Sequence, residues 1–284
     1  MVGQPEIPAQ KLDLPGKESE MTPRPDYGNS YKGSGKLKDK VALITGSDSG
    51  IGRAIAVHFA KEGAHIAIAY WKEHSDAEET KKVVEAEGVQ TILIPGDLIE
   101  EAQCKKVVDE TVKKFGRIDI LVNNAAFQGP CLKSFTDIDR ERLERTFNVN
   151  IIAYMSVAAK AVKHMAKGSA IINICSIQAF QPMAGILDYA STKGAITTFT
   201  KGAGAELISK GIRVNGIAPG PVWTPLVPSS FPEDMIDDFG AEMTPIKRAA
   251  QPFEYGPPAV FLAHEPSSSN IVACILNITG GMFM

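Results

Sequence analysis

The stretch that decides the fold is Lys40-Val-Ala-Leu-Ile-Thr-Gly-Ser-Asp-Ser-Gly-Ile-Gly52, followed by Arg53-Ala-Ile-Ala-Val-His-Phe-Ala-Lys-Glu62. Its first residues are apolar and have strand character, and the apolar residues after the glycines recur at helical spacing. A strand, a glycine-rich turn and a helix in this order are the context that a nucleotide-binding fingerprint requires. Gly46 allows the tight turn, Gly50 lets a pyrophosphate approach backbone N–H groups, and Gly52 lets the helix pack closely on the strand.

The remainder of the chain alternates short apolar runs with amphipathic stretches. We predict strands at residues 41–44, 66–70, 91–94, 118–122, 170–174, 213–217 and 271–278, and helices at residues 76–87, 101–115, 139–167 and 189–209. Strands that alternate with helices pair in parallel through right-handed crossovers. The prediction is therefore an α/β fold, a doubly wound parallel sheet of Rossmann type, in a single domain over residues 39–284.

Two segments depart from this alternation. Residues 1–38 are rich in Pro, Gly, Lys, Glu and Ser and have almost no apolar periodicity, which predicts an extended arm or an irregular wrap over the surface. Residues 225–248, rich in Pro, Phe and acidic residues, interrupt the pattern late in the chain and are a candidate lid over a substrate site.

The composition fits one large α/β core in a soluble enzyme. The chain has 284 residues, of which 44% are hydrophobic, and a net charge of −3. This weak negative charge argues against the clustered basic face of a nucleic-acid-binding protein, and no apolar run reaches membrane-spanning length. The four cysteines and five histidines lack the spacing of a disulfide framework or a metal site. We therefore expect a cytoplasmic, reduced protein that binds no metal, nucleic acid or membrane.

The stretch Tyr189-Ala-Ser-Thr-Lys193 carries the clearest chemistry. In a helix, residues four apart share a face, so the phenol and the ammonium would point the same way. A nearby ammonium favours the phenolate and would lower the tyrosine pKa from about 10. Such a group exchanges a proton with a substrate oxygen near neutral pH. Ser176, thirteen residues before the tyrosine, accompanies the pair.

These motifs occur together in one order along the chain: Thr45-Gly-x3-Gly-x-Gly52, Asp97, Asn123-Asn-Ala-Ala126, Asn150, Ser176, Tyr189-x3-Lys193 and Pro219-Gly220. In this order and spacing the chain resembles the short-chain dehydrogenase/reductase family from about Lys40 onward. Within that family it is similar to the subgroup with a proline-rich N-terminal arm. The resemblance to this subgroup implies an NADP-dependent aldehyde or alcohol oxidoreductase.

The resemblance assigns a role to each of four residues. Tyr189 would protonate a carbonyl oxygen as hydride arrives, or accept the proton in the reverse direction. Ser176 would donate a hydrogen bond to that oxygen and stabilise its developing charge. Lys193 would depress the tyrosine pKa and hold the nicotinamide ribose hydroxyls, and Asn150 would support a water-linked proton relay from the lysine. The cofactor carries the hydride chemistry, and the protein orients it.

The resemblance also implies the cofactor contacts. Asp97 would cap the adenine amino group, Leu98 would pack on the adenine ring, and Thr224 would bind the nicotinamide amide. The full set expected to bind the cofactor consists of Gly46, Ser49, Gly50, Ile51, Gly52, Tyr70, Lys72, Asp97, Leu98, Asn123, Ala125, Ala126, Tyr189, Lys193, Pro219, Gly220, Val222 and Thr224.

The choice between the two nicotinamide cofactors depends on the end of the second strand. A carboxylate there would bind the ribose 2′-hydroxyl and favour NAD. The chain reads Ala69-Tyr-Trp-Lys72 at that position, so no carboxylate repels a 2′-phosphate. Lys72 is a candidate partner of that phosphate, and Arg53 is a second one. NADP(H) is therefore the favoured cofactor, with NAD(H) as the alternative.

Three functions remain open. The first is a small carbonyl or alcohol oxidoreductase, with aldehyde reduction favoured; the second is a sugar dehydrogenase of the glucose type; the third is a non-catalytic sensor of nicotinamide redox state. The expected substrate pocket, residues 127–132, 177–187 and 225–248, mixes glutamines with Phe and Met, which suggests a ligand with polar and apolar parts. The resemblance further implies a homo-oligomer, commonly a tetramer.

Overall fold

The computed structural model describes residues 6–237 and 239–282. Within them a seven-stranded sheet has the order β3-β2-β1-β4-β5-β6-β7, with every neighbouring pair parallel. The strands are β1 (Val41–Thr45), β2 (His65–Tyr70), β3 (Thr91–Pro95), β4 (Ile120–Asn123), β5 (Ala170–Ile174), β6 (Arg213–Pro219) and β7 (Ile275–Ile278). The predicted doubly wound α/β fold is confirmed.

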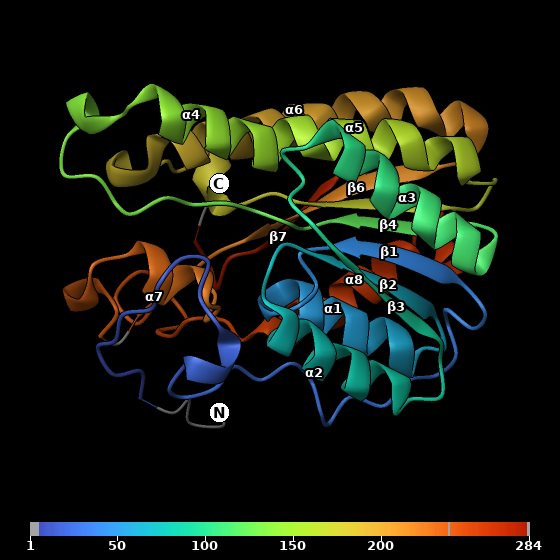
Figure 1. Cartoon of the computed structure of the whole chain (residues 1–284), viewed down its shortest axis with the longest axis horizontal. Coiled ribbons are helices and arrows are strands. Elements are labelled where there is room, and N and C mark those ends of the chain that lie inside the picture. The colour runs from blue at the N-terminus through green and yellow to red at the C-terminus, as the bar shows by residue number, and fades with distance from the viewer. Residues whose placement is uncertain (1–5, 238, 283–284) are drawn as a thin grey trace.

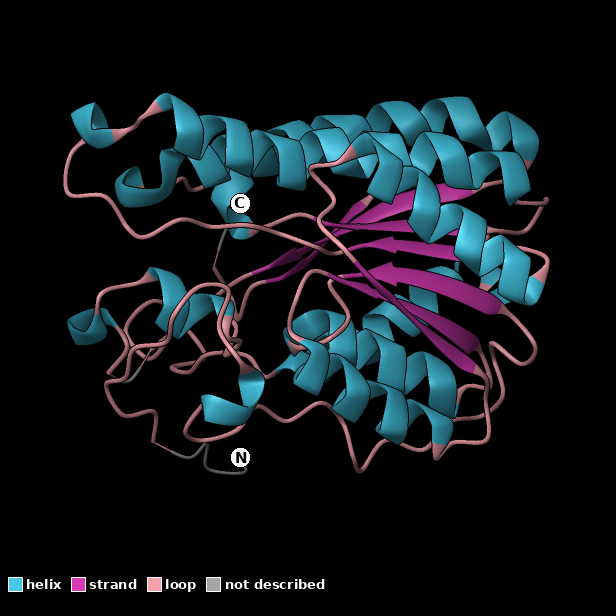
Figure 2. Ribbon diagram, viewed as in Figure 1, coloured by secondary structure: helices cyan, strands magenta, loops and turns pink. Residues whose placement is uncertain are grey.

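Helices cover both faces of the sheet (Figures 1 and 2). One layer holds α1 (Gly50–Lys61), α2 (His74–Glu85) and α8 (Gly256–Ala263), and the other holds α3 (Glu101–Phe115), α4 (Arg140–Phe147), α5 (Ala153–Ala161) and α6 (Leu187–Leu207). The short helices α7 (Leu226–Ser230) and α9 (Glu265–Ser268) complete the set in the described residues.

Two cores form because successive strand residues point to opposite faces of a sheet. In β1 all five residues are buried. Ile44 packs in the cluster that contains Phe59 of α1, whereas its neighbour Leu43 packs in the cluster that contains Val107 of α3. A strand buried on both faces reads as a continuous apolar run, which is the pattern that the sequence shows.

Most predicted boundaries lie within two residues of the observed ones, and two larger differences have identifiable reasons. Strand β7 begins at Ile275 and not at residue 271, because Ala273 has a positive φ of 56° that an extended strand cannot accommodate. The helix expected over residues 139–167 is divided by a π-helical turn, Asn148–Ile152, between α4 and α5. Such turns are frequent at functional sites.

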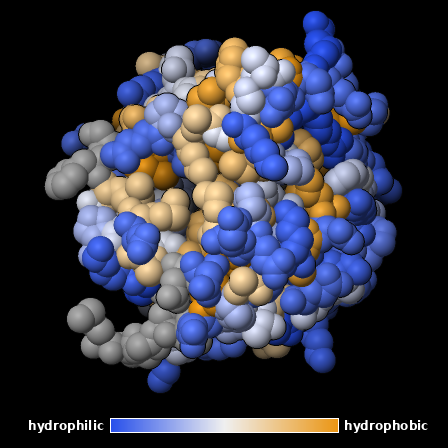
Figure 3. All heavy atoms as spheres, turned by 90° about the vertical axis from the view of Figure 1, so that its left-hand side faces the viewer, coloured by the Kyte–Doolittle hydropathy of each residue, from blue (hydrophilic) through white to orange (hydrophobic). Residues whose placement is uncertain are grey.

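The carboxyl ends of the parallel strands lie at one edge of the sheet, on the left of Figure 1. Figure 3 faces this side of the molecule, where hydrophobic residues lie between hydrophilic ones. Residues 6–38 run along the same side and over α1 with one short 3₁₀ turn, Glu18–Glu20. Leu37, near the end of this arm, is buried in the core beside α1.

Candidate active site

One cleft lies where the glycine turn, the start of α6 and the segment after β6 meet. Its wall includes most residues that the sequence predicted: Gly46, Ser49, Gly50, Ile51, Tyr70, Lys72, Asp97, Leu98, Ala125, Ala126, Ser176, Tyr189, Lys193, Pro219, Gly220, Val222 and Thr224. Gly52, Asn123 and Asn150 do not line it. The residues converge because parallel strands bring the loops at their carboxyl ends to one edge.

The glycine turn between β1 and α1 depends on the absence of side chains. Gly46 and Gly50 have φ angles of +63° and +53°, which residues with a Cβ rarely adopt. A Cβ atom on Gly52 would lie 2.1 Å from the carbonyl oxygen of Gly46, so close packing at the start of α1 requires glycine. The Asn124 side-chain amide donates to the carbonyl oxygens of Thr45 (3.0 Å) and Gly46 (2.7 Å) and fixes the turn.

Two predicted asparagines support the site from behind the wall. The amide of Asn123 donates to Asn173 Oδ1 at 2.9 Å inside the sheet, where both side chains are buried. Asn150, in the π-helical turn, donates to the carbonyl oxygen of Phe127 (2.9 Å) and to Thr192 Oγ1 (3.1 Å). Its own Oδ1 accepts the N–H of Phe127 at 2.7 Å. Asn150 therefore joins the loop after β4 to helix α6.

Ser176, Tyr189 and Lys193 come together at the inner end of the cleft. Ser176 follows β5, and its hydroxyl accepts the backbone N–H of Gln178 at 3.1 Å. Tyr189 lies in the first turn of α6, and Lys193 lies one turn further on. The Lys193 ammonium donates to the carbonyl oxygen of Ile174 at 2.9 Å and lies 5.2 Å from the centre of the Tyr189 ring.

Burial sets the protonation of this cluster. Tyr189 is 8% exposed and Lys193 is 1% exposed. Burial raises the pKa of Tyr189 well above its ordinary value, although the hydrogen bond with Ser176 opposes the rise. Burial also lowers the pKa of Lys193 to about 8. The expectation of a lowered tyrosine pKa is wrong here, because desolvation raises the pKa and the phenol stays protonated at neutral pH.

The far end of the cleft carries two cations, the predicted Lys72 and Arg145, which the sequence did not indicate. The ammonium of Lys72 lies 4.4 Å from the ring centre of Trp71, and the guanidinium carbon of Arg145 lies 4.5 Å from it. Arg145 comes from α4 and pairs with Asp97, whose other oxygen accepts the N–H of Ile99 at 3.1 Å. Both carboxylate oxygens of Asp97 are therefore engaged. No local pattern marks Arg145, since only the fold brings α4 to Asp97 in the loop after β3.

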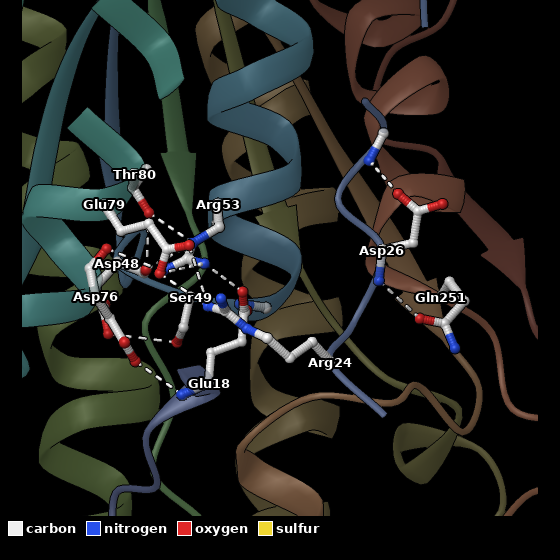
Figure 4. A network of polar contacts seen from close by, with 12 residues as sticks. Glu18, Arg24, Asp26, Asp48, Ser49, Arg53, Asp76, Glu79, Thr80 and Gln251 are labelled. Carbon is white, nitrogen blue, oxygen red and sulfur yellow. Dashed lines mark hydrogen bonds and ion pairs between the residues drawn. The ribbon is translucent and has the colours of Figure 1, made fainter. Parts of the chain in front are cut away.

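Arg53, the second candidate partner of a 2′-phosphate, lies outside the cleft. Its guanidinium is fully buried beneath the glycine turn and pairs with Glu18 of the N-terminal arm (Figure 4). It also donates to Thr80 Oγ1 at 2.7 Å and to the carbonyl oxygen of Asp48 at 3.0 Å. The sequence expectation for Arg53 is therefore corrected, and Lys72 remains as the candidate.

The substrate side of the cleft combines carboxamides with apolar side chains. Gln128 donates to Ser230 Oγ at 2.7 Å, and Gln178 Oε1 accepts the N–H of Met183 at 2.7 Å. The candidate lid contributes to the same wall the residues Pro225, Leu226, Val227, Phe231, Phe239 and Met243. Residue 238, within that segment, lies outside the described residues.

Comparisons with known proteins identify the family. The family model described as enoyl-(acyl carrier protein) reductase matches residues 46–283. NADPH-dependent aldehyde reductase 1 of Arabidopsis thaliana is 50% identical, covering 94% of each chain. The glucose and ribitol dehydrogenase of Daucus carota is 52% identical, covering 93% of this chain and 92% of that protein.

The comparison with solved structures agrees with these sequence relatives. A short-chain dehydrogenase from Burkholderia cenocepacia, solved in complex with NADP, is 31% identical and has a TM-score of 0.80, covering 87% of this chain and 98% of that one. The chain belongs to the short-chain dehydrogenase/reductase family and is an oxidoreductase. Within the described residues no helix is long and apolar enough to span a membrane, and no His, Cys, Asp and Glu side chains form a metal-binding group.

Proposed function

We propose that this chain transfers hydride between NADP(H) and a small carbonyl or alcohol, with aldehyde reduction as its main reaction. The observation that carries the proposal is the buried cluster of Ser176, Tyr189 and Lys193 at one end of the cleft, with a phenol that is protonated at neutral pH. A protonated phenol is the form of a general acid, which suits reduction of a carbonyl.

The residues present fit a nicotinamide dinucleotide. Gly50 carries no side chain at the cleft wall, so a pyrophosphate can approach the backbone at the start of α1, next to the Gly50 N–H that Glu18 binds. Trp71 and Lys72 offer a ring face and a positive charge at one end of the cleft, and Lys193 offers an ammonium at the other. We assign the adenosine to the first end and the nicotinamide ribose to the second.

The catalytic roles follow from the positions of the side chains. The bound cofactor supplies the hydride. Tyr189 donates its phenolic proton to the carbonyl oxygen, and Ser176 donates a hydrogen bond to the same oxygen as negative charge develops. Lys193 holds the ribose hydroxyls and supplies the replacement proton, while Asn150 fixes the loop and helix on either side of this route.

The preference for NADP(H) rests on charge at the end of β2. Tyr70, Trp71 and Lys72 line the cleft there, and none of them is a carboxylate that would repel a 2′-phosphate. The aldehyde reductase relative is NADPH-dependent by name, and the Burkholderia structure contains NADP. NADH is the weaker alternative.

A sugar dehydrogenase is the second candidate function. The carboxamides of Gln128 and Gln178 line the cleft and can exchange hydrogen bonds with hydroxyl groups of a sugar. The Daucus carota relative is named a glucose and ribitol dehydrogenase. The mixture of these amides with Phe231 and Phe239 favours short substrates that carry both an apolar part and a hydroxyl.

The experiment that tests the function is NADPH oxidation with a panel of short aldehydes, ketones and aldoses, run in parallel with NADH. Direct titration of both cofactors gives their dissociation constants. We expect turnover of aldehydes and a dissociation constant for NADPH several-fold below that for NADH. Tight cofactor binding without turnover of any substrate would favour a non-catalytic redox sensor instead.

We also propose that the chain acts as a cytoplasmic homotetramer. The tetramer follows from the family resemblance, and exposed apolar residues such as Ile152 and Met155 along the π-helical turn and α5 support an interface there. The four cysteines are unpaired, which suits a reducing compartment. Light scattering coupled to size-exclusion chromatography tests the tetramer, and a mass of one or two chains would reject it.

A further inference from the structure

The N-terminal arm is packed into the same apolar cluster as the catalytic tyrosine. Its residues Ile7, Leu12 and Met21 are buried, and this cluster also contains Tyr189 and Trp223. Figure 1 shows the arm, in dark blue, alongside α7. Pro15 and Gly16 of the arm line the cleft itself. The arm is therefore part of the cleft wall.

One part of the arm is fastened to the candidate lid. The backbone N–H of Leu12 donates to the carbonyl oxygen of Pro228 at 2.9 Å. The Lys11 ammonium donates to the carbonyl oxygens of Ser229 (3.2 Å) and Phe231 (3.0 Å). At Gly16 the contact is so close that a Cβ atom would lie 2.7 Å from the carbonyl oxygen of Pro225. These contacts hold α7 and its flanks against the arm.

The next part of the arm is fastened to the glycine turn (Figure 4). Glu18 is 1% exposed, and its Oε2 accepts the N–H of Gly50 at 2.7 Å. Its other oxygen pairs with the guanidinium of Arg53, and its own N–H donates to Asp76 Oδ2 at 2.8 Å. Ser49, the residue that precedes α1, makes no side-chain capping bond. Glu18 thus caps α1 from 32 residues away.

Attaching the arm through a buried carboxyl group carries a desolvation cost. Ion pairs removed from water recover little more than their desolvation cost, so apolar residues would hold the arm at least as well. The Glu18 carboxyl group instead supplies direction, because its Oε2 fixes the N–H of Gly50, next to Ile51. The exposed pair Lys17–Glu20 in the same segment has no such contact with the turn.

We propose that the arm is a working part of the cofactor site, in which Glu18 is a positioning residue that aligns the turn at Gly50 and Ile51. Through Lys11 and Leu12 the arm ties the lid to that turn, and so sets how long the dinucleotide stays bound. The inference rests on the proposed function, since it takes NADPH as the ligand of this cleft.

The test measures NADPH binding and dissociation by its fluorescence, without turnover, in the full-length protein. For Glu18→Ala we expect the dissociation rate and the dissociation constant to rise about 10-fold or more, because the turn amides lose their alignment. Glu18→Gln keeps an acceptor for the Gly50 N–H and should recover part of the affinity. Glu20→Ala, an exposed control two residues away, should change neither quantity by more than about twofold.

A second ligand separates positioning from general damage. Adenosine 2′-monophosphate contains no pyrophosphate, so its affinity should be the same in Glu18→Ala and wild type. Equal NADPH binding by Glu18→Ala and wild type, or equal weakening of both ligands, would overturn the inference. If Glu18→Ala does not fold, the NADPH dissociation rate is measured in Lys11→Met, which replaces an exposed residue that binds the candidate lid. An unchanged dissociation rate in Lys11→Met would overturn the proposal. Failure of the wild type to bind NADPH would instead refute the proposed function.

Discussion

The guanidinium of Arg142 forms a two-point ion pair with the carboxylate of Asp188, the residue directly before Tyr189. The two hydrogen bonds are 2.9 and 3.0 Å long, and Thr146 donates a third to the same carboxylate at 2.8 Å. Burial opposes ionisation of Asp188, but the hydrogen bonds from Arg142 and Thr146 hold its pKa below the ordinary value. Helix α4 therefore fixes the start of α6, and with it the position of the Tyr189 phenol.

Loss of this ion pair should destabilise the fold. We expect Arg142→Met to lower the free energy of unfolding by about 3 kcal/mol, because it leaves the buried Asp188 without its partner. Urea denaturation at pH 7 measures the change. Arg140→Met breaks an exposed pair with Glu144 on the same helix and should cost less than about 1 kcal/mol. Equal effects of the two substitutions would show that the buried pair does not anchor α6.

Removal of the Tyr189 hydroxyl should stop the chemistry and spare binding. In Tyr189→Phe we expect turnover to fall about 1000-fold, since the general acid is lost, while the NADPH dissociation constant changes less than about twofold. Tyr154→Phe is the matched control, because its buried hydroxyl has no hydrogen-bond partner within the described residues. Turnover that survives in Tyr189→Phe would remove the tyrosine from the mechanism.

The rate of reduction should fall as the pH rises through about 8, where Lys193 loses its proton. Burial lowers the pKa of Lys193, so the folded state favours the neutral lysine. The contribution of this group to the free energy of unfolding therefore rises above pH 8, whereas the rate of reduction falls. The pH profile of kcat/KM measures the effect. Lys193→Arg keeps its charge to higher pH. If Lys193→Arg retains activity, the alkaline limb should shift upward, and an unmoved limb would contradict the assignment.

Lys72 should contribute to the choice of cofactor. Its ammonium is held over Trp71 at the open end of the cleft, so we expect Lys72→Met to raise the dissociation constant for NADPH about fivefold, worth about 1 kcal/mol for a solvent-screened pair. NADH, which lacks the 2′-phosphate, should bind unchanged. Calorimetric titration of both cofactors gives the comparison, with Lys106→Met on the exposed side of α3 as the control. A loss shared equally by both cofactors would exclude a role in discrimination.

The glycine turn and the strand–helix alternation were predictable because they are local. The predicted helix 101–115 and strand 170–174 coincide with α3 and β5. In such elements the buried positions recur at a fixed spacing, and this spacing is visible in the sequence as the pattern of apolar residues. The two larger boundary differences, at Ala273 and at Asn148–Ile152, depend on a positive φ and a π-helical turn. Neither leaves a mark in hydrophobic periodicity.

By itself, the sequence determined the α/β fold, the glycine turn and the three side chains that meet at Ser176, Tyr189 and Lys193. Only the tertiary structure decided that Arg53 serves the arm, that Arg145 reaches Asp97, and that burial raises the tyrosine pKa. The physical reason is one of range. Backbone preference and side-chain periodicity act over a few residues, whereas desolvation and ion pairing depend on which distant segments close over a group, and an arm without periodicity gives no sign of where it will pack.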